Sequence, residues 1–163
     1  MKKLNFGSGS AIKKGWDNVD VQEGKELTQS FDFNEFPYPI KDNTYDYVYL
    51  NNVLEHLFEC DKVIMELRRI TKPNGIIKII VPHYTNKSAY NDLQHKRFFN
   101  EICFKNLITQ GAIIDQKEIF KIVKLKLPPT KVSVFIPGKI RNKLSLFING
   151  LIKEIDIELK VIK

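Results

Sequence analysis

Residues 4–10 read Leu4-Asn5-Phe6-Gly7-Ser8-Gly9-Ser10, and Asp20 follows eleven residues after Gly9. The first three of these residues predict a short strand that runs into two glycines one residue apart. Because glycine has no Cβ, Gly7 and Gly9 can adopt positive φ and let a ligand approach the backbone closely. A carboxylate at the end of the neighbouring strand, here Asp20, can accept hydrogen bonds from the hydroxyls of a ribose. The stretch therefore predicts a binding pocket for a nucleoside.

The residues after the two glycines narrow the kind of nucleoside. A dinucleotide fingerprint has a third glycine and opens a helix whose N-terminus binds a pyrophosphate. Residues 10–15 leave room for barely one helical turn before the next strand candidate at residues 18–21. The pattern therefore disfavours a diphosphate and favours an adenosine ligand without phosphate, of which S-adenosylmethionine is the common example.

Several later segments continue this pattern. Asp32 supplies a second acid, and the apolar residues 45–50 lead into Asn51-Asn52-Val53-Leu54-Glu55-His56-Leu57. A helix with paired arginines follows, and Lys72-Pro73-Asn74-Gly75 then precedes a strand at residues 76–81. Over roughly residues 3–100 the chain resembles the small "type 11" class I S-adenosylmethionine-dependent methyltransferases.

The resemblance implies a three-layer α/β/α Rossmann-like fold in a single domain, residues 1–163. Its sheet would be mostly parallel and seven-stranded with an antiparallel edge, and its helices would be abbreviated in the N-terminal half. The almost continuously apolar residues 76–81 predict a central strand covered on both faces. Strands are expected at residues 3–6, 18–21, 30–33, 45–50, 76–81, 119–127 and 155–162, and helices at residues 61–71, 100–110 (with Gly111 as the stop) and 141–154.

The resemblance also assigns cofactor contacts. Asp20 would bind the ribose hydroxyls, Asp32 would lie near the adenine amino group, and Asn51 would lie near the methionine part. The alternatives are a tight turn at the glycines, a surface acid at Asp20 and a simple turn at Asp32. Asn52 and Glu55 have the spacing of a capping box, and His56 beside them is interpreted as structural. The predicted cofactor-binding residues are Asn5, Gly7, Ser8, Gly9, Asp20, Val21, Asp32, Phe33, Asn51 and Asn52.

The polar segment at residues 83–99 leaves the carboxyl end of the central strand, where loops usually carry the chemistry. It contains His83 and His95, and an imidazole can act as a base near neutral pH. We therefore predict His95, and after it His83, as catalytic residues. The alternative is a packed loop in which His95 bonds to Asp92. His83, Asp92 and His95 do not have a known metal-ligand spacing, so no metal is expected.

The positive charge is concentrated in the C-terminal part. Residues 1–116 hold 15 Lys or Arg and 15 Asp or Glu, whereas residues 117–163 hold 11 basic and 4 acidic residues. This excess is either a solvated lysine-rich face or a patch for an anionic substrate or RNA. Aromatic residues are sparse there, which argues against a platform that stacks single-stranded bases.

Other features favour a soluble cytoplasmic protein. No apolar run approaches the ~18 residues of a membrane span, so no membrane partner is expected. The N-terminal Met1-Lys2-Lys3-Leu4 lacks the apolar region of a signal peptide. Cys60 and Cys103 are too few for a disulfide framework, which fits a reducing compartment.

The expected function is transfer of a methyl group from S-adenosylmethionine to oxygen or nitrogen of a small-molecule or sugar acceptor. Two other classes stay open. One is a non-catalytic module that binds S-adenosylmethionine, and the other is an RNA-binding protein that uses the basic C-terminal third.

A homodimer is also expected. Only eleven residues join the strands at residues 3–6 and 18–21, and a parallel crossover generally needs a dozen or more, mostly helical. One side of the sheet would then be thinly covered and could form an interface. The alternative is that residues 34–44 fold back and cover the gap. The apolar side chains expected at the interface are Trp16, Phe31, Phe33, Phe36 and Tyr38.

Overall fold

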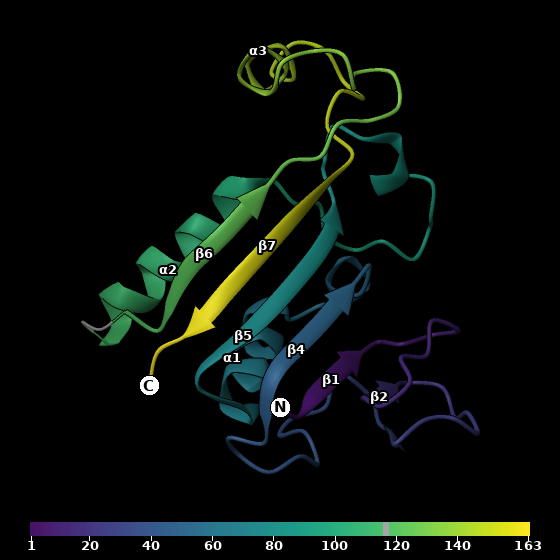
Figure 1. The fold of residues 1–163 in the computed structure, drawn as a ribbon, viewed down its shortest axis with the longest axis vertical. Helices are drawn as coiled ribbons and strands as arrows, with labels where there is room; N and C mark the ends of the chain where they lie inside the picture. Colours follow the sequence, from purple (N-terminus) through teal and green to yellow (C-terminus); the bar gives the residue numbers. More distant parts are fainter. Residues whose placement is uncertain (116–117) are drawn as a thin grey trace.

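The computed structural model describes residues 1–115 and 118–163, with the backbone alone for residues 109–115. Seven strands form one sheet in the order β3-β2-β1-β4-β5-β7-β6 (Figure 1). The strands are β1 (Lys3–Phe6), β2 (Asp17–Asp20), β3 (Gln29–Ser30), β4 (Tyr45–Asn51), β5 (Thr71–Pro82), β6 (Phe120–Lys126) and β7 (Glu154–Val161). The three α-helices are α1 (Cys60–Ile70), α2 (Glu101–Asp115) and α3 (Gly138–Leu144), and two short 3-10 helices are η1 (Leu54–His56) and η2 (Lys87–Ala89).

Most neighbouring strands of this sheet are parallel. The pairs β3-β2, β2-β1, β1-β4 and β4-β5 run parallel, whereas β7 runs antiparallel to both β5 and β6. The predicted mixed sheet with an antiparallel edge is therefore confirmed. The carboxyl ends of the parallel strands lie at one edge, which is where open α/β sheets bind ligands.

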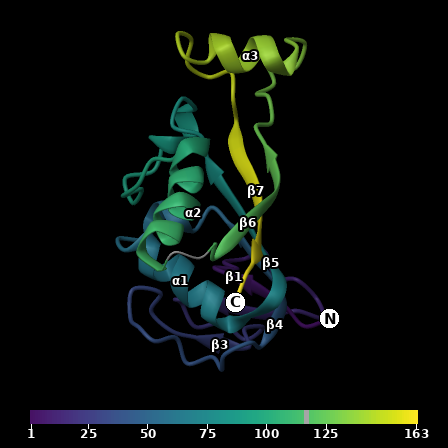
Figure 2. The same ribbon diagram turned by 90° about the vertical axis from the view of Figure 1, so that its left-hand side faces the viewer.

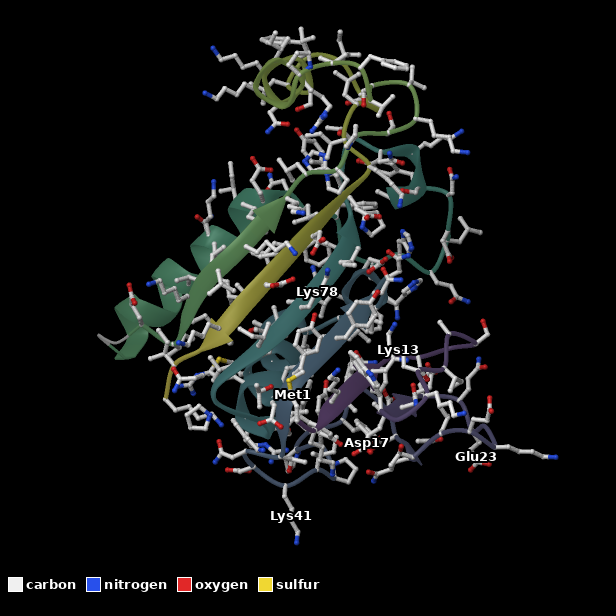
Figure 3. The ribbon with its side chains drawn as sticks, in the orientation of Figure 1. Met1, Lys13, Asp17, Glu23, Lys41 and Lys78 are labelled. Carbon is white, nitrogen blue, oxygen red and sulfur yellow. The ribbon has the colours of Figure 1, made fainter. Side chains whose placement is uncertain are left out.

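The helices α1 and α2 cover the same face of the sheet (Figures 1 and 2). Along β5, Ile77, Ile79 and Val81 point to that face and are fully buried, whereas Ile76, Lys78 and Ile80 alternate with them and are half-buried. Figure 3 shows Lys78 on the open face, where its Nζ lies 3.2 Å from Asp156 on β7. The prediction that residues 76–81 are covered on both faces was wrong, because no described helix packs against the second face.

Residues 10–16 take the place of a helix on the open face. Trp16 packs edge-on against Tyr47 and Tyr49, with ring centroids 5.8 and 6.4 Å apart. Lys13 lies over the ring of Tyr49, 4.5 Å from its centroid. The abbreviated N-terminal half is therefore confirmed, and the second helical layer is reduced to this loop.

The predicted helices agree with the observed ones to different degrees. In α1 the stripe of Val63, Ile64, Leu67 and Ile70 is buried as the periodicity indicates. The helix α2 continues past Gly111 to Asp115, so the predicted stop was wrong. The predicted helix at residues 141–154 was also wrong, because α3 ends at Leu144 and Gly150 turns the chain at φ +81°. No helix in the described part of the chain is both long and apolar enough to span a membrane.

Residues 31–44 fold back against the helix-covered face. The Phe33 ring stacks on Phe6 with centroids 3.9 Å apart, and Tyr38 lies 5.5 Å from Phe6. Arg69 of α1 holds this segment by donating to the carbonyl oxygens of Tyr38 and Ile40. The expected apolar interface is therefore wrong for these aromatics, which form core instead. The homodimer itself stays a prediction.

Candidate active site

The glycine turn after β1 is built against β2 and β4. The N–H groups of Gly7 and Ser8 both donate to the carbonyl oxygen of Val19, at 2.9 and 3.1 Å. Gly7 has φ +71°, and a Cβ placed on it would lie 2.4 Å from Cγ2 of Val53. Gly9 has φ +47° and faces open space within 4 Å. Glycine is therefore required by packing at Gly7, whereas at Gly9 it leaves room for a ligand.

Asp20 stands at the carboxyl end of β2 beside this turn. Its Oδ2 accepts a hydrogen bond of 2.6 Å from the Gly9 N–H, and its Oδ1 accepts one of 3.3 Å from the Gln22 N–H. Gly9, Ser10 and Asp20 share a cavity of about 380 Å³ with residues 22–27. A carboxylate has about four acceptor positions, so Asp20 keeps capacity for the hydroxyls of a ribose.

Asn5, predicted as a cofactor contact, is buried and holds the loop that follows the glycine turn. Its buried amide donates to the carbonyl oxygen of Ala11 and to Oδ1 of Asn18, both at 2.9 Å. Asn18 in turn accepts from the Lys13 N–H and donates to the carbonyl oxygens of Lys13 and Trp16. The Asn5–Asn18 pair therefore fixes the loop over the open face. Asn18 was missed in the sequence because nothing in its context marks it.

The residues predicted to lie near the adenine differ in how exposed their side chains are. Val21 is 55% exposed next to Asp20 and offers an apolar surface. Asp32 is exposed, and its Oδ1 accepts from the N–H and the side-chain amide of Asn34, as in the simple turn considered above. Phe33 is buried on Phe6, so it supports the wall of the site through its packing.

Asn51 ends β4, Asn52 follows it, and both are exposed at the carboxyl edge of the sheet. Asn52 has φ +55°, and its N–H donates to the carbonyl oxygen of Ile80. The predicted capping box with Glu55 was wrong, because η1 begins after Val53 and has no side-chain cap. The hydroxyl of Ser8 is buried and has no partner among the described residues, which leaves one polar group for a ligand.

A second cavity of about 340 Å³ lies at the same edge of the sheet. Its lining comes from the segment after β4, from the end of β5 with the loop that follows it, and from the beginning of β7. The lining residues are Asn52, Glu55, His56, Pro82, Ser88, Asp92, His95, Lys153 and Glu154. Ligand-type atoms of Glu55, His56 and His95 lie within 4.8 Å of one another. We call these three residues the Glu-His-His cluster.

Glu55 is 1% exposed, and neither of its carboxylate oxygens has a hydrogen-bond partner among the described residues. Burial raises the pKa of this carboxyl to about 7. Its backbone oxygen accepts from the N–H groups of Lys96 and Arg97, at 2.7 and 3.2 Å, which ties the 83–99 loop to η1. Glu55 is thus a buried carboxyl that lacks a polar partner, as expected for a group that binds a substrate.

His95 is oriented by one hydrogen bond. Its Nδ1 lies 2.8 Å from the carbonyl oxygen of Ala89, and because a carbonyl only accepts, Nδ1 must carry the proton. In the neutral imidazole Nε2 then has a free lone pair. The His95 ring lies edge-on to His56, with centroids 4.7 Å apart, and burial lowers the pKa of His56.

His83 lies outside the Glu-His-His cluster. It is buried, its Nδ1 is 2.7 Å from the Thr85 hydroxyl, and its Nε2 is 3.7 Å from Glu101 of α2. Burial lowers the pKa of His83, and the residue does not line the cavity of the Glu-His-His cluster. This placement favours a structural role. The sequence pattern favoured a structural role for Glu55 and His56, although their position in the segment after β4 was a usable signal.

Comparison with known proteins agrees with this geometry. The family model described as a methyltransferase domain matches residues 13–79. Over these residues the chain is similar to methyltransferase domains, and the solved structures that match it share its fold. No curated protein sequence matches this chain.

Solved structures share the fold over almost the whole chain. A S-adenosylmethionine-dependent methyltransferase from Archaeoglobus fulgidus has a TM-score of 0.69 at 18% identity, covering 98% of this chain and 85% of that one. A putative methyltransferase from Bacillus halodurans has a TM-score of 0.67 at 12% identity, with 99% and 93% covered. The Haloferax volcanii complex of the Trm112 methyltransferase activator with a putative methyltransferase gives 0.66 at 11% identity, with 99% and 82% covered.

Proposed function

We propose that this protein is an S-adenosylmethionine-dependent methyltransferase, which transfers a methyl group from S-adenosylmethionine to an oxygen or nitrogen atom of a small polar acceptor, such as a sugar. The observation that carries the proposal is the pair formed by Glu55 and His95. A buried carboxyl that has no hydrogen-bond partner in the described part of the chain and an oriented imidazole both line a cavity at the carboxyl edge of the sheet. The glycine turn and Asp20 stand at the same edge.

The residues around Gly9 fit the cofactor. The open space at Gly9 and the remaining acceptor capacity of Asp20 suit the ribose. Val21 and Asp32 would lie along the adenine, and Gly7, Ser8, Asn51 and Asn52 along the methionine part. We propose that Asn5 and Phe33 support these contacts from behind.

S-adenosylmethionine carries its methyl group on a positively charged sulfonium. The leaving group is a neutral thioether, so it needs no further activation. The protein therefore contributes mainly alignment, which can be worth about 7–11 kcal/mol. His95 Nε2 would accept the proton of the acceptor hydroxyl or ammonium, and the carboxylate of Glu55 would stabilise the imidazolium that forms. Lys153 and Glu154 would orient the acceptor from the β7 side.

The cavity supports a polar acceptor of modest size. Its volume of about 340 Å³ lies at the small end of ligand sites. Its lining is mostly charged or hydrogen-bonding, which suits a molecule with several hydroxyls. The cysteines Cys60 and Cys103 are free, which supports the cytoplasmic location that we propose.

The test is a methyl-release assay with methyl-labelled S-adenosylmethionine across separate pools of sugars, small phenols, amines and RNA. Transfer to a sugar, phenol or amine pool by the wild type, lost in His95→Gln, would support the proposal. Equal transfer by the two proteins would remove His95 from the mechanism. Cofactor binding without transfer to any pool would favour the non-catalytic module.

A further inference from the structure

Residues 128–153, which we call the tip, join β6 to β7 and contain α3. The tip projects beyond the sheet at the end where the parallel strands finish (Figures 1 and 2). The cavity of the Glu-His-His cluster opens at this end, since Lys153 and Glu154 contribute to its lining. A surface that contacts the tip would therefore lie near the acceptor site.

The tip is held in shape by polar contacts within it and with the segments next to it. The Thr130 hydroxyl donates to the carbonyl oxygen of Gly150 at 2.7 Å, and the Ser133 hydroxyl donates to that of Leu151. The buried Arg141 donates to the carbonyl oxygen of Leu127 at 2.9 Å. The Gly150 N–H reaches the carbonyl oxygen of Thr85 in the loop that leads to His95. The tip thus has a defined shape.

The outer surface of the tip is apolar to an unusual degree. Phe135 is 93% exposed, Phe147 is 87% exposed and Val132 is 86% exposed. Val134, Ile140 and Leu146 are each more than half exposed. Large contiguous apolar patches on a folded protein mark a contact surface.

The charged residues of the tip and of the preceding strand β6 are all positive. Residues 119–153 contain eight Lys or Arg and no Asp or Glu. Lys131, Lys139 and Lys143 are exposed in the tip beside the apolar side chains. Exposed phenylalanine and aliphatic residues interleaved with lysine are the composition of segments that lie in the interface of an anionic membrane.

We propose that the tip docks this protein peripherally on an anionic lipid surface, with Phe135 and Phe147 inserted and the lysines at the headgroups. The expectation that no membrane is contacted rested on the absence of a spanning segment, which peripheral docking does not require. Docking would hold the acceptor cavity close to the headgroup layer. A further cavity of about 600 Å³ between the tip and the 85–90 segment is lined by Val132, Ile148 and Tyr90 and continues the apolar surface inward.

Two other occupants fit the observations less well. RNA is recognised by stacking on aromatic planes, and most of the exposed apolar side chains here are aliphatic. A second copy of the chain would bring two tips of the same positive sign together, and like charges repel. Lipid headgroups with negative charge complement the lysines and the apolar side chains at once.

The test is sedimentation of the full chain with vesicles of phosphatidylcholine alone and of phosphatidylcholine with one third phosphatidylglycerol. We expect binding to the anionic vesicles and weak binding to the neutral ones, with loss at high ionic strength. The double variant Phe135→Ser/Phe147→Ser should bind about tenfold or more weakly. Lys139→Glu/Lys143→Glu should weaken binding by at least about 25-fold, since each lysine near an anionic surface contributes about fivefold and each glutamate adds repulsion.

Matched controls separate docking from general surface changes. Leu93 is fully exposed in the 83–99 loop, so Leu93→Ser should leave vesicle binding unchanged. Lys41 lies at the end of the molecule away from the tip (Figure 3), and Lys41→Glu paired with Lys14→Glu should change binding far less than the tip pair. Circular dichroism would verify that each variant is folded.

Two outcomes would overturn the proposal. The first is that the folded wild type does not sediment with the anionic vesicles, and binding of an RNA oligonucleotide or concentration-dependent self-association through the tip would then name the other occupant. The second is that the tip variants bind the vesicles as well as the wild type does. Neither result would bear on methyl transfer, which the release assay measures without lipid.

Discussion

The backbone N–H of Gly9 donates a 2.6 Å hydrogen bond to the carboxylate of Asp20, which joins the turn after β1 to the end of β2. The two residues are eleven positions apart in the sequence, and the parallel pairing of β1 with β2 brings them together. This contact sets the distance between the glycine turn and the proposed ribose site. The cofactor pocket is therefore held by the same strand pairing that defines the fold.

The two glycines of the turn should respond differently to substitution. Gly7→Ala places a Cβ against Val53 at positive φ, so the free energy of unfolding should fall by about 2–4 kcal/mol. Gly9→Ala meets no atom within 4 Å and should cost about 1–2 kcal/mol for its φ alone, while it weakens cofactor binding. Urea unfolding and calorimetry measure the two effects. Equal losses of stability would contradict the packing difference between the two glycines, and an unchanged cofactor affinity in Gly9→Ala would contradict the assignment of Gly9 to the ligand.

The Phe33 side chain should act as core. Phe33→Ala should destabilise the protein by about 3–5 kcal/mol, because it removes a buried ring stacked on Phe6. The exposed Phe135 serves as a control, and Phe135→Ala should change stability by less than about 0.5 kcal/mol. If Phe33→Ala instead altered the mass in light scattering and left stability intact, these aromatics would form an interface after all.

The protonation of Glu55 should make stability depend on pH. The folded pKa of about 7 lies above the ordinary value of 4.5, so the protonated form is favoured by folding. Below the ordinary value this contribution is fully present, and it is lost as pH rises through the folded pKa. Wild-type stability relative to Glu55→Gln should therefore fall between about pH 4.5 and 7, by up to about 3 kcal/mol. Urea unfolding of both proteins across this range measures the difference, and a constant difference would mean that Glu55 is not buried as described.

His95 should affect turnover without affecting the cofactor. If His95 Nε2 accepts the acceptor proton, His95→Gln should lower turnover by about 10²–10⁴-fold, with the affinity for S-adenosylhomocysteine unchanged. His83→Gln is the comparison, and its effect should appear in stability because His83 is buried between Thr85 and Glu101.

The same lone pair of His95 distinguishes a base from a metal ligand. The donor atoms of the Glu-His-His cluster lie within 4.8 Å of one another, and donors that share one zinc ion lie about 3.4 Å apart. If His95 acts as the base, chelators should leave turnover unchanged and added Zn²⁺ should inhibit, since the ion would compete for Nε2. Loss of activity on chelation, restored by a metal, would make the cluster a metal site.

The sheet could be predicted from the sequence because each strand is marked by its own local pattern. The glycine turn, Asp20 and the strand at residues 76–81 all fall where they were expected. The covering of the sheet could not be predicted, because it depends on which distant segment packs there. Residues 31–44 bury Phe33 and Tyr38 against Phe6, and only the tertiary structure shows that this segment fills the gap.

The candidate site was predictable only where a residue carries a local signal in the sequence. His95 stood out as one of few histidines in a polar loop. Glu55 fitted a capping box by spacing alone, and its lack of any partner is visible only when the 83–99 loop closes over η1. The exposed surface of the tip was hidden by a helical pattern at residues 141–154 that Gly150 interrupts.

The most direct test of the account is calorimetric titration of S-adenosylhomocysteine into the wild type and into Asp20→Ala, with Asp61→Ala on the exposed start of α1 as the control. The account predicts that the wild type and Asp61→Ala bind with equal affinity. Asp20→Ala should lose about 1.5–3 kcal/mol of binding free energy, the range for a hydrogen bond to a charged group. Unchanged affinity in a folded Asp20→Ala would contradict the placement of the ribose, and a wild type that binds neither S-adenosylhomocysteine nor S-adenosylmethionine would contradict the proposed function itself.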